Sequence, residues 1–492
     1  NLDPYGDMLE NFAWGQEFSW GTNKHPPLAG WVTGLWFAFM PRYDTAYHLL
    51  SYLNVMLGLL GMHRVAVTMG FARIAAPSVL LLAIAFPYST LAVKFNANAI
   101  LLSVWPWVVF GWLKSQREGG SKGLWWTIFF GIVSALALLG KYYSGVLMIA
   151  LLLTSFSSEQ GRMWLKTFKP WLAGGVFFLA LLPHMMWLTN NDFISVAYIS
   201  EQSGGDRAYK GLLKFVFAPI LYWFFPLIFC AWVSSAGIKS TRLRFIGWCK
   251  NLGGAWRCQG WDDTLFWLVM LPWLLTICFG LSGIVDLSLP WAIPLGFGFP
   301  LLWIRNLWEV EIETIISHHH IVLKIFSAWL LLIVLGSPLY AFLESATESK
   351  NYYRPRVEAA HAILDLWQEE VPDEQLYWVA GLWPENGLIS FYGDPGITML
   401  PGPPDSAGAK AVSSIDWRQK AGLILCPRKQ AATPPPTFCA RDMQRWLKKN
   451  KITQTRHRVR VKKTGFRFLS DWEFEYFVYI YLPKKGANDN DD

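Results

Sequence analysis

The N-terminal segment carries the side chains best suited to acid–base chemistry. Asp7 and Glu10 are three residues apart, so on a helix they share one face. A carboxylate held in a fixed position can act as a general base or can orient a substrate. The plainer alternative is a solvated loop in which one of these acids caps a helix. Lys24 and His25 follow, directly before two prolines.

The sequence KFNAN joins a cation to two amides between two apolar runs. Lys94, Asn96 and Asn98 could hold a phosphate and the hydroxyl groups of a sugar. The alternative is a lysine that snorkels to an interface beside two asparagines that end helices. A second junction of apolar runs contains Lys141, and an ionisable residue in such a place is a functional candidate. It is followed by Tyr142 and Tyr143.

The stretch from residue 183 to residue 202 mixes aromatic rings with hydrogen-bonding groups. Its candidate binding residues are His184, Trp187, Asn191, Asp192 and Tyr198, with Arg207 just beyond. Such a mixture is typical of surfaces that bind sugars. A belt of interfacial aromatic residues beside a wet loop would explain the same composition. Asp286 and Trp291 offer one further contact of this kind.

Long apolar runs separate these polar segments and must position them. The chain has 492 residues, of which 53% are hydrophobic and 16% are charged, whereas soluble domains carry about 25% charged residues. A spanning helix needs about 20 mostly apolar residues. We therefore expect about ten spans, near residues 44–62, 74–92, 97–114, 123–140, 142–157, 170–188, 211–235, 264–282, 287–304 and 321–343. Residues 26–40 form a shorter run, which predicts an interfacial helix.

The distribution of charged residues among the loops supports this number of spans. Every loop that follows an odd-numbered span is basic, as expected for loops on the cytoplasmic side. The net charge of +8 therefore reflects topology and does not indicate nucleic-acid binding. The same parity places residues 1–43 and 344–492 on the non-cytoplasmic side, which is the periplasm in a Gram-negative bacterium. Because the chain starts with polar residues, we expect a further span to precede them.

The pattern of residues 344–492 predicts a small α/β domain. It follows a membrane domain that is expected at residues 1–343. A helical pattern covers 355–371, and strands are expected at 375–380, 421–426, 456–463 and 472–482. Pro- and Gly-rich breaks separate them at 395–404 and 433–436. Cys426 and Cys439 are the cysteines of this segment. In an oxidising compartment they could form a disulfide, or they could be two independent core residues.

The C-terminal segment also contains a basic stretch. Residues 441–467 hold eleven Lys or Arg residues and one acid. This stretch could bind an anionic lipid or polysaccharide, or it could be only a solvated face.

Taken in order, the acid-rich first segment, HPPL, KFNAN, GKY and PHMMW with NNDF resemble the polytopic glycosyltransferases of the GT-C class that use polyprenyl-phosphate sugars. That class includes the protein O-mannosyltransferases and the aminoarabinose transferases that modify lipid A. The motifs RVEAAHAILDLW and VAGLWPENGLISFY of the tail are most similar to the rhizobial-type lipid A and core galacturonosyltransferase group.

The resemblance implies an all-α polytopic membrane fold of the GT-C type with a small C-terminal α/β domain. It implies sugar transfer, with inversion, from a polyprenyl-phosphate donor to lipid A, lipopolysaccharide core or another acceptor at the periplasmic face of a bacterial inner membrane. Asp7 and His25 span nineteen positions counting both ends, which matches the family's catalytic Asp. Met8 replaces the family's paired acid, so Glu10 is the candidate substitute.

The resemblance also distributes the remaining roles. Lys94, Lys141 and Arg207, with Lys24 and His25, are expected to hold the donor phosphate. The expected substrate-binding residues are Asn96, Asn98, Tyr142, Tyr143, His184, Trp187, Asn191, Asp192 and Tyr198. Many relatives carry an acid where this chain has Asn96 and Asn98. No metal ligand is therefore assigned, and a divalent metal stays an open alternative.

Two other functions fit parts of the sequence. A transporter or flippase of lipid-linked sugars would show inverted repeats and ionisable groups near the middle of the membrane. The ionisable groups here cluster at one set of span ends, which favours an enzyme. A membrane binding protein with a decayed active site is the other alternative, because the paired acid is missing. Side-chain types identify neither the sugar nor the acceptor.

Overall fold

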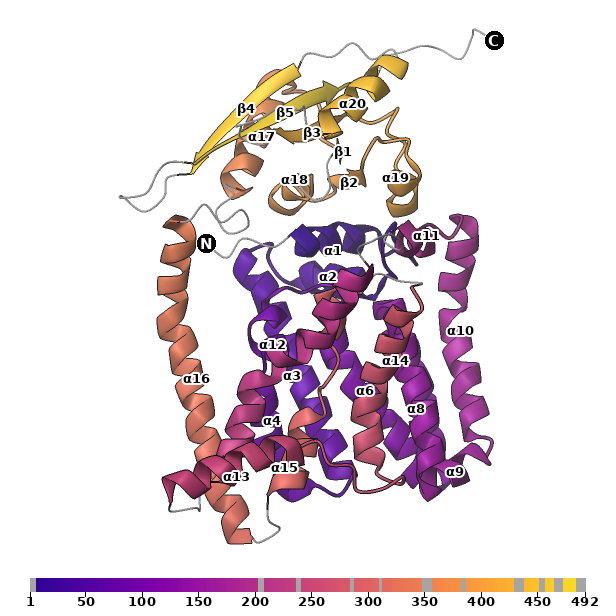
Figure 1. The fold of residues 1–492 in the computed structure, drawn as a ribbon. Helices are drawn as coiled ribbons and strands as arrows, with labels where there is room; N and C mark the ends of the chain where they lie inside the picture. Colours follow the sequence, from indigo (N-terminus) through magenta and orange to yellow (C-terminus); the bar gives the residue numbers. More distant parts are fainter. Residues whose placement is uncertain are drawn as a thin grey trace. The chain divides into compact units, whose positions relative to one another are not determined.

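The computed structural model describes residues 6–201, 208–235, 240–283, 287–308, 312–346, 356–381, 386–428, 438–450, 456–463 and 472–483. The chain divides into two compact units. Unit 1 comprises Asn1–His48, Trp187–Ser195 and Leu335–Asp492, and unit 2 comprises Leu49–Met186 and Val196–Val334. Figure 1 shows the helices and strands of both.

The described part of unit 2 is helical, and several of its helices begin or end in unit 1. The helices from residue 44 to residue 346 are α3 (Asp44–Thr68), α4 (Ala72–Ala83), α5 (Phe86–Ser89), η1 (Leu91–Val93), α6 (Ile100–Arg117), α7 (Gly120–Gly140), η2 (Tyr142–Ser144), α8 (Gly145–Ser157), α9 (Glu159–Leu165), α10 (Lys169–Asn190), α11 (Ile194–Glu201), α12 (Ala208–Ser234), α13 (Thr241–Gly254), α14 (Thr264–Leu281), η3 (Leu289–Ala292), α15 (Phe299–Leu307) and α16 (Ile312–Ala346).

Six of the described helices are long and apolar enough to cross a membrane. They are α3, α7, α10, α14, residues Gly211–Ser234 of α12 and residues His318–Tyr340 of α16. Helix α4 and the segment Phe86–Val93 meet the same criterion together, with a bend of 73° between them. The expected polytopic helical fold is therefore confirmed.

Three predicted spans differ from these. Helix α6 has 18 residues, but its last turn holds Lys114 and Arg117, and Tyr142–Ser157 is a shorter apolar helix. The prediction of one continuous helix at 287–304 is wrong, because turns separate η3 from α15 and Gly296 has φ 81°. Proline removes a backbone donor and kinks or breaks a helix. The prolines of this range are Pro290, Pro294 and Pro300.

Basic side chains tie together helix ends that the charge pattern assigns to one side. Lys169 donates to the main-chain oxygens of Ser115 and Glu118 at 2.8 and 2.6 Å. Arg117 donates to the main-chain oxygen of Thr68. Cations are favourable at helix C-termini, where unpaired carbonyls and the helix dipole are negative. The ends of α3 and α6 and the start of α10 therefore lie together within unit 2, as the parity of the loops predicts.

The C-terminal segment of unit 1 forms a five-stranded sheet with helices. Its elements are α17 (Arg356–Glu370), β1 (Trp378–Gly381), α18 (Gly387–Tyr392), β2 (Thr398–Pro401), α19 (Ala407–Val412), β3 (Gly422–Arg428), α20 (Phe438–Lys449), β4 (Arg456–Lys463) and β5 (Trp472–Tyr481). The strand order is β2-β1-β3-β5-β4. Strand β1 is parallel to β2 and β3, whereas β5 is antiparallel to β3 and β4.

The four predicted strands and the predicted helix of this segment are confirmed. Strand β2 was missed because it lies inside the Pro- and Gly-rich range 395–404. Cys426 and Cys439 form a disulfide, with Cα atoms 5.7 Å apart. This bond joins β3 to α20, which packs its apolar residues against one face of the sheet. Of the two alternatives for these cysteines, the disulfide is therefore correct.

Two short helices, α1 (Gly6–Glu17) and α2 (Leu28–Phe39), complete the described part of unit 1. Helix α2 is the short apolar helix expected at 26–40. The backbones of α1 and α2 approach closely, because a Cβ atom at Gly34 would lie 2.3 Å from the carbonyl oxygen of Gly15. The Phe12 ring of α1 meets the edge of Phe391 of α18, with centroids 5.0 Å apart. The first helices and the C-terminal segment thus pack as one unit.

We predict that Gly34→Ala destabilises the protein by roughly 1–3 kcal/mol, because the added methyl group forces two backbones apart. Thermal unfolding of the detergent-purified protein would measure this. Gly175→Ala is the matched control, since its Cβ would meet nothing within 4 Å. Equal melting temperatures for wild type and the Gly34 variant would contradict the close packing of α1 on α2.

Candidate functional site

Helix α1 carries Asp7 in its first turn and Glu10 one turn later. Asp7 is exposed, whereas Glu10 is only 8% exposed. The Glu10 carboxylate lies 2.5 Å from the Lys24 ammonium, and the Lys24 side chain is 23% exposed. The helix thus presents one acid to solvent and buries the other in an ion pair.

The environment of Glu10 changes its acidity. Burial raises the pKa of Glu10 to about 7, although Lys24 lowers it, and the negative charge of Asp7 adds to the rise. A buried acid with a perturbed pKa and a specific charged partner is a candidate functional group. Glu10 can therefore gain or lose a proton near neutral pH, one helical turn from the exposed Asp7.

A closed turn holds Lys24 and His25 against α1. The Thr22 hydroxyl donates to the His25 carbonyl at 2.8 Å and accepts from the His25 N–H at 2.9 Å. The His25 ring meets the Trp14 ring edge to face, with centroids 6.0 Å apart. Such Thr-closed turns fix the backbone locally. The structure therefore brings together four predicted site residues in unit 1: Asp7, Glu10, Lys24 and His25.

Tyr47 fixes the start of α1 and was not singled out from the sequence. Its side chain is fully buried, and its hydroxyl donates to the main-chain oxygen of Met8 at 2.5 Å. The same hydroxyl lies 3.5 Å from that of Thr33 in α2. Because Met8 directly follows Asp7, this contact holds the backbone that carries the acid. A tyrosine inside a predicted apolar span was the available signal.

Arg42 and Asp44 connect the first helices to α18 and were also missed. The Arg42 guanidinium donates to the Gly393 carbonyl at 3.3 Å. The Tyr392 hydroxyl donates to the Asp44 carboxylate at 2.8 Å. Two charged residues at the junction of two apolar runs were a usable signal. Their contacts show that the C-terminal segment is part of the surroundings of α1.

A second polar cluster lies in unit 2 and joins two predicted segments. The Lys141 ammonium donates to the Asn98 side chain at 2.5 Å, across 43 residues of sequence. It also lies 5.2 Å from the centroid of the Trp291 ring, which is a cation–π distance. KFNAN and GKY therefore form one constellation, and Trp291 belongs to it.

The three residues that follow Lys141 each contact a different helix. The Tyr142 hydroxyl lies 2.9 Å from Nε2 of the buried His184 in α10. The Tyr143 hydroxyl lies 2.7 Å from that of Thr276 in α14. Ser144 accepts from the Trp105 indole at 3.0 Å. The junction between α7 and α8 is thus fixed by α6, α10 and α14, as a rigid ligand platform requires.

Asn96 stabilises the turn that precedes α6. Its side-chain oxygen accepts from the N–H groups of Asn98 and Ala99, each at 2.9 Å, directly before α6. Contacts of an Asn side chain with the N–H groups two and three residues further on form a local turn. Lys94 is half-buried at the end of η1. A substrate-binding role for either residue stays a prediction.

The remaining predicted residues are distributed over both units. Trp187 packs over Gly21, where a Cβ atom would lie 2.1 Å from its ring. Asn191 donates to the Trp187 carbonyl at 2.8 Å and so caps the end of α10. Asp192 is exposed and has φ 50°. Two other candidates are Tyr198, half-buried in α11 of unit 2, and Arg207, which like Asp286 lies outside the described residues.

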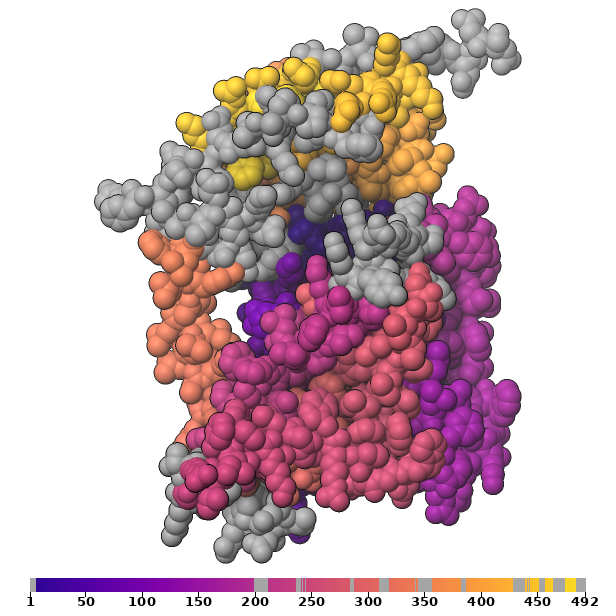
Figure 2. All heavy atoms as spheres, viewed as in Figure 1, coloured from indigo at the N-terminus to yellow at the C-terminus, as the bar shows by residue number. Residues whose placement is uncertain are grey.

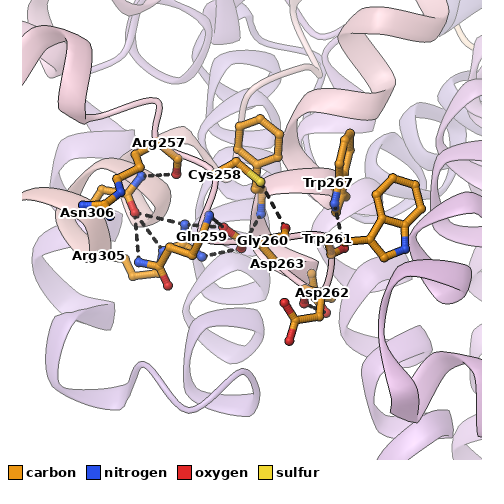
Figure 3. Close-up of polar contacts among 12 residues, drawn as sticks. Arg257, Cys258, Gln259, Gly260, Trp261, Asp262, Asp263, Trp267, Arg305 and Asn306 are labelled. Carbon is orange, nitrogen blue, oxygen red and sulfur yellow. Dashed lines mark hydrogen bonds and ion pairs between the residues drawn. The ribbon is translucent and has the colours of Figure 1, made fainter.

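A polar network around residues 257–267 was not predicted (Figure 3). Arg305 donates with both terminal nitrogens to Asp263, whose side chain is only 2% exposed. Asp263 also accepts from the Phe266 N–H at 3.0 Å and caps α14. Burial alone would raise the pKa of Asp263, but hydrogen bonds from Arg305 and two backbone N–H groups outweigh it and lower the pKa. The ion pair clamps this loop to α15.

Among the residues that the structure describes, no three His, Cys, Asp or Glu side chains gather as metal ligands would.

Glu10→Gln tests the buried acid through the pH dependence of stability. Since the pKa of Glu10 is raised from 4.5 to about 7, the folded protein binds more protons than the unfolded chain between these values. Stability from this group therefore falls as pH rises through that window. Glutamine does not ionise, so the variant does not lose this stability. As the pH rises from about 5 to about 8, the melting temperature of wild type should fall relative to that of the variant.

A difference between wild type and the Glu10 variant that is constant with pH would contradict the raised pKa.

Residues 24–187, one third of the chain, match the family model described as dolichyl-phosphate-mannose-protein mannosyltransferase. No curated protein matches significantly. The solved structure of ArnT from Cupriavidus metallidurans bound to undecaprenyl phosphate is 12% identical, with a TM-score of 0.56, and the match covers 96% of this chain and 93% of that one.

The apo structure of the same ArnT is 13% identical over the same shares, with a TM-score of 0.45. At these identities the likeness concerns the fold. The chain thus has an ArnT-like fold over nearly its whole length, and the family model supports the resemblance to the GT-C class.

Proposed function

We propose that this chain is a membrane glycosyltransferase that moves a sugar from a polyprenyl-phosphate donor to a glycolipid acceptor. The observation that carries the proposal is the first helix: an exposed Asp7 on α1, whose position is fixed by the buried pair of Glu10 and Lys24. The ArnT-like fold supports the donor class, because that ArnT was solved with undecaprenyl phosphate bound.

In the proposed reaction an acceptor hydroxyl attacks the anomeric carbon of the donor sugar. A bond forms between the hydroxyl oxygen and that carbon, and the bond from the carbon to the phosphate oxygen breaks. Polyprenyl phosphate leaves with the bonding electron pair, and the hydroxyl proton passes to the Asp7 carboxylate. Attack from the face opposite the leaving group inverts the anomeric configuration. Glu10 acts as the second acid and holds Lys24 in place.

Cations are needed because the leaving phosphate gains charge as the bond breaks. Lys141 suits this role, since Asn98 and Trp291 hold its ammonium group in place. We assign Lys94 and Arg207 to the same role, and His25 to the shape of the first loop or to the phosphate. The sugar and acceptor contacts are assigned to Tyr142, Tyr143, His184, Trp187, Asn191, Asp192 and Tyr198, with Asn96 and Asn98.

The acceptor class follows from topology. The basic loops favour a cytoplasmic position for the ends of α3 and α6. Residues 1–43 and a domain at 344–492 then face the periplasm of a bacterial inner membrane, where lipid A and lipopolysaccharide core are exposed. A lysine-lined donor site suits an acidic sugar such as galacturonic acid, in line with the galacturonosyltransferase resemblance of the tail.

Asp7→Asn should lower transfer by about 10²–10⁴-fold, the usual contribution of a general base. The test is a deletion strain complemented with each variant and mass spectrometry of its lipid A and core oligosaccharide. Glu17→Gln should restore the wild-type profile. Full complementation by the Asp7 variant, at equal membrane abundance, would reject Asp7 as the base.

Lys141→Gln should weaken binding of undecaprenyl phosphate by roughly tenfold, because it removes one charge-assisted hydrogen bond to phosphate. Microscale thermophoresis of the purified protein with this lipid would measure the change. Lys122→Gln is the control, since Lys122 is an exposed cation in the first turn of α7. Unchanged affinity in the Lys141 variant would remove this lysine from the donor site.

A further inference from the structure

Strand β4 carries a row of cations that the proposed reaction does not use. Arg456, Arg458, Arg460 and Lys462 are exposed, whereas Val461 between the last two is buried. Alternate residues of a strand point to one face and lie about 7 Å apart. The row therefore places four cations at regular spacing along the edge of the sheet, because β4 is the last strand in the order.

Helix α20 adds cations to the same face of the sheet. Its exposed cations, at helical spacing, are Arg441, Arg445, Lys448 and Lys449. Its buried residues pack with Phe477 and Tyr479 of β5. Those two residues pair in register with Arg458 and Arg456 of β4, so the row on β4 and helix α20 share one face. We call these eight residues the basic face; Figure 2 shows parts of α20 and β4 in yellow at the surface.

Contacts hold the cations of β4 in place without covering them. The Arg456 guanidinium lies 4.7 Å from the centroid of the Phe477 ring. Arg458 and Arg460 lie 2.8 and 3.4 Å from the Glu475 carboxylate, yet their side chains stay 43% and 59% exposed. Side chains ordered before binding lose less entropy when a ligand binds. Cations that are both ordered and exposed are suited to binding an anionic ligand, whereas a face that is only solvated does not need ordered side chains.

The position of the basic face within unit 1 limits its partner. At the opposite edge of the sheet, β2 and the residues near it contact α1: the Glu17 carboxylate accepts from Thr398 at 3.4 Å and from Ser413 at 2.9 Å. Four strand spacings, about 19 Å, separate β2 from β4. Helix α2, which packs on α1, exposes Leu35 and Phe39. The strand β4 of the basic face therefore lies at the edge of the sheet opposite to the one that contacts α1.

We infer that the basic face binds an extended polyanionic oligosaccharide, namely the acidic glycan that projects from the acceptor lipid. The identity of that glycan as the acceptor's own rests on the proposed function, whereas its binding does not. Regularly spaced arginines recognise phosphate and carboxylate groups through paired donors. The position of β4, at the edge of the sheet opposite to the contact with α1, argues against lipid headgroups near α2.

Binding of a linear oligogalacturonate to the full detergent-purified chain tests this directly, with maltooctaose as the neutral control. The variant R456Q/R460Q/K462Q should bind about tenfold more weakly, since each exposed charge contact contributes about 1.5- to fivefold. The matched variant K410Q/R418Q/K420Q removes three exposed cations from other parts of the same segment and should bind as wild type does. The KM for the natural acceptor should rise in the first variant with kcat unchanged.

Three results would overturn the inference: no binding of oligogalacturonate at low salt, equal weakening in both triple variants, or binding only to vesicles of phosphatidylcholine and phosphatidylglycerol. Loss of transfer in the Asp7 variant is measured separately. Failure of the proposed function therefore leaves the binding result readable, and failure of binding leaves the transfer result readable.

Discussion

The buried contact between Glu10 and Lys24 is the interaction on which the N-terminal site depends. It ties α1 to the turn that precedes α2, and that turn is itself closed by Thr22. Removing one partner of a shielded pair leaves the other charge without compensation. The cost of the contact is visible in the raised pKa of Glu10. The contact thus stabilises a position of α1, and with it the exposure of Asp7, more than it stabilises the fold.

Polar contacts also fix the helix junctions of unit 2, where helices break at the ends of apolar runs. Backbone and side-chain polar groups in such places need partners inside the protein. Lys141, Tyr142, Tyr143 and Ser144 meet this need by contacting separate helices or turns. The result is a fixed platform of one cation and two hydroxyl-bearing rings. This helix junction therefore also holds the surrounding helices in register.

Helix identity was predictable because apolar runs of span length have few other structures available. The strands of the tail were predictable for a similar reason, since alternating or continuous apolar runs repeat at the strand period. Strand β2 was not, because its four residues lie among prolines and glycines. The helix expected at 287–304 failed for the converse reason: its hydropathy fits a span, but the chain turns between η3 and α15, where Gly296 has φ 81°.

Side-chain partners were less predictable than elements. The spacing of Asp7 and Glu10 predicts a shared face because it is local. The pairing of Asn98 with Lys141 depends on the packing of helices 43 residues apart, which no local pattern encodes. Arg305 directly follows the ninth predicted span, where the parity of the loops calls for a basic residue, yet it is paired with Asp263. A charge can mark a membrane side and still have a partner, and only the fold shows that partner.

Sugar transfer consumes the donor, whereas transport leaves the donor intact. The fate of the donor therefore tests the central claim most directly. The measurement is the amount of free polyprenyl phosphate released when the purified protein, reconstituted in vesicles, meets a polyprenyl-phosphate sugar and a membrane lipid extract. Transfer predicts release of one polyprenyl phosphate for each sugar that appears on the acceptor. An intact donor that only changes leaflet, with no polyprenyl phosphate released, would contradict it.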